Sequence, residues 1–165
     1  MELKELFVLA IQGEVEAREL YLSASERTKD KKAKKVFLNL SQEEDSHIKA
    51  LQEIAENTLK GEKVSVPAIA PIESFDDAQS PIFTPEFKAS IKDKHYEVST
   101  LRIGMKLESE SAVFYRDFAG KINNPEVKEF LLYLAKWETN HYENLKKQMG
   151  FIEEFYMTQN SMFRF

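Results

Sequence analysis

Apolar and small residues recur at alternating steps of four and three in the first part of the chain, which is the spacing of one face of an amphipathic helix. The face formed by residues 2–28 consists of Leu3, Phe7, Ala10, Ala17 and Tyr21. From Asp30, a residue type that caps helix starts, the same spacing continues to Ile54. The pattern therefore predicts two long helices that pack in a bundle.

A second pair of helices is predicted in the last half of the chain. Thr84-Pro85-Glu86 places a proline where a first helical turn accepts it, and a third long helix is expected to run to about Lys121. Asn124-Pro125 has the pattern of an N-cap followed by a first turn, so a fourth helix is expected to start there. Gly150 is a natural residue for its end.

The two helical pairs are separated by a proline-rich segment at about residues 60–85, which is predicted to be a long crossover. We therefore predict one domain, residues 1–150, built as a four-helix bundle. The remaining tail, residues 151–165, is rich in aromatic residues and methionine. It is expected to pack on the bundle or on a partner.

The segment Leu40–Leu51 returns later in the chain as Leu134–Leu145, with Leu, Glu, His and Leu at the same spacing. Both copies contain Glu-x-x-His, and the offset between the two histidines is 141 − 47 = 94 positions. The same offset relates Glu14 to Glu108, the charged residues on the otherwise apolar faces of the first and third helices. The chain is therefore predicted to be an internal duplication of a helical hairpin.

Each predicted hairpin brings its polar residues to one level. Glu14 lies about 15 residues before the first turn and Glu44 about 15 residues after it, so at about 1.5 Å per residue they reach the same height. His47 lies on the same helix face as Glu44, because positions i and i+3 are neighbours. With helices two and three parallel, six side chains should meet at mid-height: Glu14, Glu44, His47, Glu108, Glu138 and His141.

Four buried carboxylates need compensating charge, because an isolated buried carboxylate is very costly to desolvate. No Lys or Arg lies on the predicted faces near them. Two divalent cations would balance four carboxylates, and neutral imidazoles can complete the ligand set. Oxygen and nitrogen donors without sulfur favour iron or manganese over magnesium or calcium, while zinc and cobalt remain alternatives.

Three aromatic residues lie close to these positions in the sequence. Tyr21 and Tyr115 lie two turns from the ligand Glu of their helices, on the same faces. Core packing is the more common role for such tyrosines, and the alternative is that their hydroxyls donate to ligand carboxylates across the site. Trp137 precedes Glu138 but is turned off the face, so packing is expected.

Composition narrows the class of protein. The 165 residues are 42% hydrophobic and 31% charged, and the net charge of −5 argues against a nucleic-acid-binding face. The absence of cysteine excludes disulfides and thiolate metal sites within this chain. No apolar run reaches membrane-spanning length and no secretion signal is recognised, so a cytoplasmic location is expected. The lysine-rich run Lys29–Lys35 is predicted to be a solvated helix start, with a docking patch for a redox partner as the alternative.

One Glu from each of two helices and Glu-x-x-His from the other two is the ligand pattern of ferritin-like carboxylate bundles. The segments E-V-E-A-R-E-L-Y with Q-E-E-D-S-H, and L-E-S-E-S-A-V-F-Y with W-E-T-N-H, resemble the di-iron domain of the rubrerythrin family over nearly the whole chain. The resemblance implies an all-α, ferritin-like up-down four-helix bundle with two iron ions. Family members commonly add a cysteine-containing rubredoxin-like domain, and commonly carry a carboxylate where Ser111 stands here.

The resemblance implies reduction of hydrogen peroxide or dioxygen with electrons from an external donor protein. Glu14 and Glu108 would be terminal ligands, Glu44 and Glu138 would bridge, and His47 and His141 would each hold one ion. A homodimer or larger oligomer is expected, without nucleic acid or membrane. The alternatives are an iron-storage or ferroxidase-type protein, a manganese catalase-like enzyme and a metal-free interaction module.

Overall fold

The structure is a computed structural model that describes residues 2–64, 81 and 95–161. These residues form long helices and no strand. The helices are α1 (Leu3–Arg27), α2 (Lys31–Lys60), α4 (His95–Ala119) and α5 (Pro125–Ser161). The predicted all-α four-helix bundle is confirmed.

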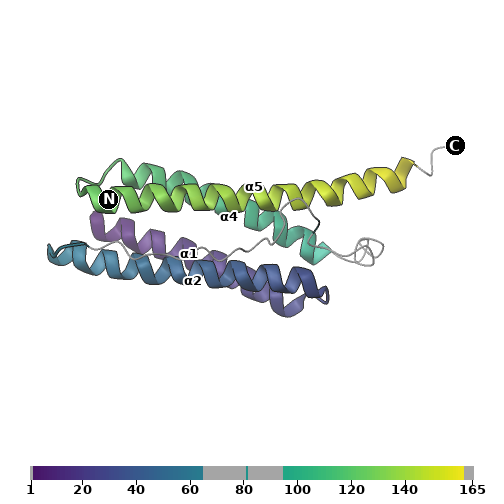
Figure 1. The fold of residues 1–165 in the computed structure, drawn as a ribbon, viewed down its shortest axis with the longest axis horizontal. Helices are drawn as coiled ribbons and strands as arrows, with labels where there is room; N and C mark the ends of the chain where they lie inside the picture. The colour runs from purple at the N-terminus through teal and green to yellow at the C-terminus, as the bar shows by residue number, and fades with distance from the viewer. Residues whose placement is uncertain (1, 65–80, 82–94, 162–165) are drawn as a thin grey trace.

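The helices form two antiparallel pairs, α1 with α2 and α4 with α5, and α1 also packs against α4. Figure 1 shows α2 and α4 running in the same direction, as the duplicated hairpin requires. Apart from residues 60–64 and 81, the predicted crossover and the expected start of the third helix lie outside the described residues. Within the described residues, no helix is both long enough and apolar enough to cross a bilayer.

Local sequence explains where the helices start. The Asp30 side chain accepts hydrogen bonds from the backbone amides of Lys32 and Ala33, at 2.9 and 3.0 Å, and so caps α2. The Asn124 side chain accepts from the amide of Val127 at 3.0 Å and caps α5 in the same way. Both predicted caps are confirmed. Gly61, with φ of 69°, ends α2 in the left-handed conformation that glycine adopts without strain.

The prediction that Gly150 ends the last helix is wrong, because α5 continues to Ser161. Met149 and Ile152, on either side of Gly150, are buried in the core and hold this part of the helix against the bundle. Their packing offsets the cost of glycine in a helix, about 1 kcal/mol. The boundary at residue 150 therefore does not coincide with a helix end, and the division into bundle and tail remains a prediction.

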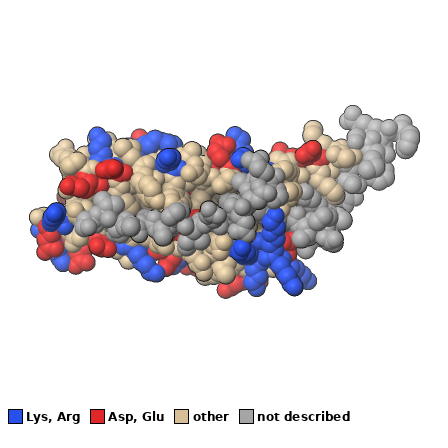
Figure 2. Space-filling model, in the orientation of Figure 1, with Lys and Arg blue, Asp and Glu red and all other residues tan. Residues whose placement is uncertain are grey.

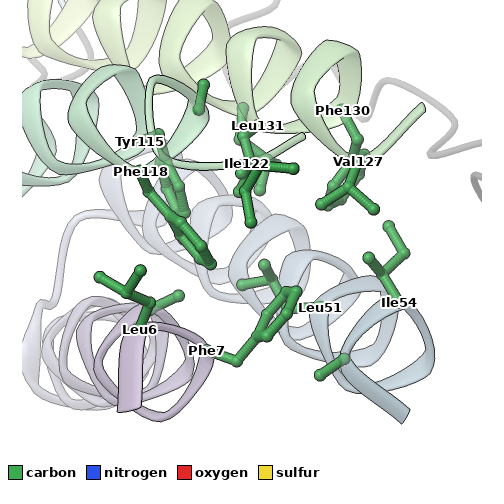
Figure 3. Packing of buried hydrophobic residues seen from close by; sticks show 14 of the residues in the cluster. Leu6, Phe7, Leu51, Ile54, Tyr115, Phe118, Ile122, Val127, Phe130 and Leu131 are labelled. Atoms are coloured by element: carbon green, nitrogen blue, oxygen red, sulfur yellow. The ribbon is translucent and has the colours of Figure 1, made fainter. Parts of the chain in front are cut away.

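Two apolar clusters fill the bundle on either side of a polar layer. Figure 3 shows the first cluster, in which the rings of Phe7 and Phe118 meet edge to face with centroids 5.1 Å apart. The second cluster includes Phe37, Leu40 and Leu101, all of them fully buried. Each such side chain contributes about 1.5–3 kcal/mol by leaving water. The polar layer is thus enclosed between two buried apolar clusters.

The lysine-rich run lies on the surface at the start of α2. Its five lysines are exposed, and Figure 2 shows the Lys and Arg side chains gathered at this end of the molecule. Those lysines are Lys29, Lys31, Lys32, Lys34 and Lys35. The expectation of a solvated helix start is confirmed, and docking of a redox partner remains a proposal.

Candidate metal centre

The polar layer consists of the six side chains singled out from the sequence. Each of the four helices contributes at its middle: one Glu each from α1 and α4, and a Glu with a His from α2 and from α5. All six side chains are buried, with relative exposure of at most 4%. The structure therefore brings together Glu14, Glu44, His47, Glu108, Glu138 and His141.

The six residues form two overlapping groups. In each group, one potential ligand atom from every residue lies within 4.8 Å of the others. The first group is Glu14, Glu44, His47 and Glu138. The second group is Glu44, Glu108, Glu138 and His141. Glu44 and Glu138 belong to both groups, which is the arrangement expected of carboxylates that bridge two ions.

Both imidazoles direct Nδ1 at the carboxylates. His47 Nδ1 lies 3.0 Å from Glu14, 3.1 Å from Glu44 and 3.2 Å from Glu138. His141 Nδ1 lies 3.4 Å from Glu44, and at 3.5 and 3.6 Å it also faces the remaining two carboxylates of its group. The ring centroids are 6.4 Å apart. The two histidines therefore face a common space with the same nitrogen.

Both tyrosines donate hydrogen bonds across the site. The hydroxyl of Tyr21, on α1, donates to Glu108 on α4, and the hydroxyl of Tyr115, on α4, donates to Glu14 on α1. Both rings are at most 1% exposed. Each tyrosine therefore packs in the core and also donates a hydrogen bond, so both roles considered from the sequence apply. Each hydrogen bond therefore links the two hairpins, because the hydroxyl belongs to one hairpin and the carboxylate to the other.

Two residues next to the site were not recognised as part of it from the sequence. Glu43 is 2% exposed, and its Oε2 lies 2.5 Å from His141 Nε2. Trp137, expected only to pack, places its indole nitrogen 2.9 Å from the same Nε2 and its ring edge-on to His47, with centroids 5.7 Å apart. Trp137 lies four positions before His141, and this helical spacing is the signal that could have identified it, whereas Glu43 reaches a histidine of the other hairpin and has no such signal.

Burial sets the protonation of two of the carboxylates. It raises the pKa of Glu14 to about 7, and the neighbouring Glu44 carboxylate adds to this effect. Burial likewise raises the pKa of Glu138 well above its ordinary value, with further contributions from Glu44 and Glu14. Both carboxyl groups therefore keep their protons to a higher pH than an exposed Glu does.

The pKa values of the two histidines are raised, and those of the other two carboxylates are lowered. Burial alone would lower the pKa of His47 and of His141, but the facing carboxylates, Glu138 for the first and Glu108 for the second, raise both pKa values well above normal. Burial also acts to raise the pKa values of Glu44 and Glu108, yet their contacts with the histidines outweigh it and lower them. Without metal, the carboxylates and imidazoles thus form one interacting set in which the protonated form of each histidine is favoured.

The residues fit a pair of divalent metal ions. Among the described residues, Glu44 Oε1, Glu138 Oε1 and His141 Nδ1 are buried without a hydrogen bond, although they face ion-pair partners at 3.2 to 3.4 Å. Such atoms are costly unless they bind something, and all three belong to the groups described above. Two divalent ions would balance the four carboxylates of these groups beside two neutral imidazoles, so metal can replace the protons that the six residues hold.

An antiparallel four-helix bundle with overlapping carboxylate and histidine groups defines a ferritin-like protein with a candidate dinuclear metal site. The chain belongs to the Rubrerythrin family, whose model matches residues 5–149. This match confirms the family resemblance seen in the sequence. No match is found among curated proteins.

A solved structure with the same fold is that of a hypothetical protein from Pyrococcus furiosus. The two chains are 25% identical and superpose with a TM-score of 0.68. The match covers 94% of this chain and 92% of the other. The bundle architecture is therefore shared along nearly the whole length of both chains.

Proposed function

We propose that the protein is a di-iron oxidoreductase that reduces hydrogen peroxide or dioxygen with electrons from an external donor protein. The observation that supports this most strongly is the pair of overlapping buried groups, each with three carboxylates and one histidine. Oxygen and nitrogen donors suit iron, and manganese is the main alternative. Membership of the Rubrerythrin family adds to the support.

In this proposal each group holds one ion. Glu14 and His47 would hold one ion and Glu108 and His141 the other, while Glu44 and Glu138, which belong to both groups, would serve both ions. When bound, two ferrous ions would supply the two electrons that reduce one hydrogen peroxide, with two protons, to two molecules of water. The protein's own contribution is to bury the site and to fix the terminal carboxylates with the tyrosine hydroxyls.

A small cavity beside the site offers room for a substrate the size of peroxide. Its volume is about 160 Å³, and it lies between α1 and α4, with Gly13, Ser111 and Tyr115 in its lining. Tyr115 also donates to Glu14, so one residue of the cavity lining contacts one candidate ligand. Gly13 and Ser111, both with short side chains, lie next to each other in this lining.

The test is metal content together with turnover. Protein expressed with iron, and separately with manganese, should bind about two ions per chain, and the iron form should consume peroxide only when a reductant is added. Glu44→Ala should abolish binding, whereas Glu16→Ala, at an exposed position on α1, should leave it unchanged. Fewer than about one ion per chain, or intact binding in the Glu44 variant, would contradict the proposal.

The same experiment separates the alternatives. Peroxide consumption without a reductant in the manganese form would indicate catalase-like chemistry. Iron uptake far above two ions per chain, in a particle of many subunits, would indicate storage. Size-exclusion chromatography with light scattering also tests the proposed homodimer or larger oligomer. A cytoplasmic location remains a prediction for cell fractionation.

A further inference from the structure

The duplication is broken at one position beside the metal centre. The offset of 94 that relates the ligands pairs Glu43 with Trp137, since 137 − 43 = 94. One half therefore has a carboxylate immediately before its Glu-x-x-His, and the other half has an indole. Both side chains reach the histidines, so this difference lies where it can act on the site.

The two histidines consequently have different outer partners. His141 Nε2 lies 2.5 Å from the Glu43 carboxylate, in a pair that is at most 5% exposed on either side. His47 Nε2 is buried and has no hydrogen-bond partner among the residues that the structure describes. The ring of Trp137 stands perpendicular to that of His47 instead. Without metal, each imidazole thus has its hydrogen-bond partners on one nitrogen: His141 on the outer Nε2, and His47 on the inner Nδ1.

The position of the proton decides which neighbour His141 uses. Its Nδ1 faces the carboxylates, so a neutral ring that binds metal through Nδ1 carries its proton on Nε2. A protonated Nε2 can donate to the Glu43 carboxylate but cannot accept from the Trp137 indole, although both lie within hydrogen-bond distance. Glu43 is therefore the partner compatible with metal ligation.

We propose that Glu43 is a positioning residue that makes the two metal positions unequal, so that the group containing His141 binds a divalent ion more tightly than the group containing His47. A carboxylate on the outer nitrogen fixes the orientation and tautomer of a ligand histidine and increases its basicity. The group containing His47 lacks this support. The inference rests on the proposed dinuclear site and adds an order of loading to it.

Calorimetric titration of the metal-free protein with Co²⁺ tests the inequality. The wild type should bind two ions in steps at least about tenfold apart, because loss of such an outer partner typically costs 10–100-fold in affinity. Glu43→Ala should weaken the tighter step by that factor and leave the other within about threefold. Glu53→Ala, an exposed position on the same helix, is the matched control and should change neither step.

Histidine variants then show which ion Glu43 serves. In a His47→Ala background, Glu43→Ala should still weaken the remaining ion, whereas in a His141→Ala background it should have no further effect. Equal weakening of both ions by Glu43→Ala, no weakening of either, or the same effect in the two backgrounds would overturn the inference. A purely structural role for Glu43 would not distinguish the two backgrounds.

Two further variants refine the result. Glu43→Gln keeps an acceptor oxygen without the charge and should give an intermediate loss with unchanged helix content by circular dichroism. Trp137→Glu supplies the missing carboxylate to the other half and should bring the two steps closer together. Two equal steps in the wild type would overturn the inequality alone, whereas failure to bind Co²⁺ would overturn the proposed metal site as well.

Discussion

The two halves of the molecule are alike in the residues that face the centre and different in the residues behind them. Each half contributes one Glu, one Glu-x-x-His and one tyrosine, all at the same offset. Behind the histidines, a buried carboxylate in one half corresponds to an indole in the other. Two equivalent ligand groups are thus placed in unequal surroundings.

This difference shows that a duplicated sequence does not guarantee equivalent sites. The electrostatics already diverge without metal: Glu14 and Glu108 are counterparts, yet the pKa of the first is raised to about 7 and that of the second is lowered. Ligand identity follows from the repeat, but affinity and protonation depend on the neighbours of each ligand. Substitutions at matching positions of the two halves should therefore show where the halves behave alike and where they differ.

The largest effect is expected from the shared carboxylates. Glu44→Gln and Glu138→Gln each remove a residue common to both groups, so each variant should lose both ions. Glu14→Gln and Glu108→Gln each affect one group, so each should retain about one ion per chain. Metal analysis after gel filtration measures the difference. Identical losses in all four variants would show that the groups are not separate positions.

Much of the fold was accessible from the sequence because several signals agreed. The four-and-three spacing, the caps Asp30 and Asn124 and the proline-rich crossover all indicated the same bundle. The six central residues were found together because their shared offset placed them at one height on facing helices. Gly150 misled because its local tendency to end a helix was outweighed by the burial of Ile152, a tertiary effect.

Other features could not be predicted because they depend on contacts between the halves. Glu43 is adjacent in sequence to Glu44 but contacts His141 from the opposite hairpin. Each tyrosine likewise donates to a carboxylate on the other hairpin, and helical periodicity says nothing about which partner a hydroxyl finds. The ligand set follows from periodicity within helices, whereas its outer partners follow from packing between them.

Proton release gives the next largest effect. The raised pKa values of Glu14, Glu138, His47 and His141 indicate that metal-free protein holds protons there, and metal ligation must displace them. Affinity should therefore rise as pH increases from about 5 to 8, by about tenfold per pH unit for each proton displaced. Calorimetry in buffers of different ionisation enthalpy counts these protons.

The stability of the metal-free protein should change in the opposite sense. A group whose pKa is raised in the folded state stabilises it below the unfolded pKa and loses that contribution as pH rises through the folded value. For Glu14 this window runs from its ordinary 4.5 to about 7. Glu44 and Glu108, whose pKa values are lowered, oppose this trend only near pH 4.5, where they are still partly protonated in the unfolded chain. A metal affinity that does not change with pH would contradict the proton release predicted above.

The tyrosines should behave alike in the two halves. Tyr21→Phe and Tyr115→Phe each remove one hydroxyl that donates to a carboxylate on the other hairpin. Leaving a buried carboxylate without its donor should cost about 1–3 kcal/mol in each case, measured by urea unfolding of the metal-free protein. Tyr142→Phe, at a partly exposed position on α5, is the control. A large cost for one central tyrosine and none for the other would show that the asymmetry extends to these hydrogen bonds.

The smallest effect is expected at Gly104, whose counterpart at the 94-residue offset is Ala10. A Cβ atom at Gly104 would lie 2.9 Å from the Tyr21 hydroxyl and 3.2 Å from Leu145, so Gly104→Ala must displace the tyrosine that holds Glu108. The cost of overpacking exceeds the gain from better helix propensity, and the net loss of stability should be about 1 kcal/mol.

Gly13→Ala is the matched control. A Cβ atom there would lie at an ordinary 3.8 Å from its nearest neighbour, Ser111 Oγ, so this substitution should stabilise the protein by about 0.5–1 kcal/mol. Gly104→Ala, which makes the two halves alike at this position, should therefore destabilise the protein, because α4 approaches Tyr21 closely only while residue 104 has no Cβ atom. Equal stabilisation by both substitutions would show that Tyr21 has room to move.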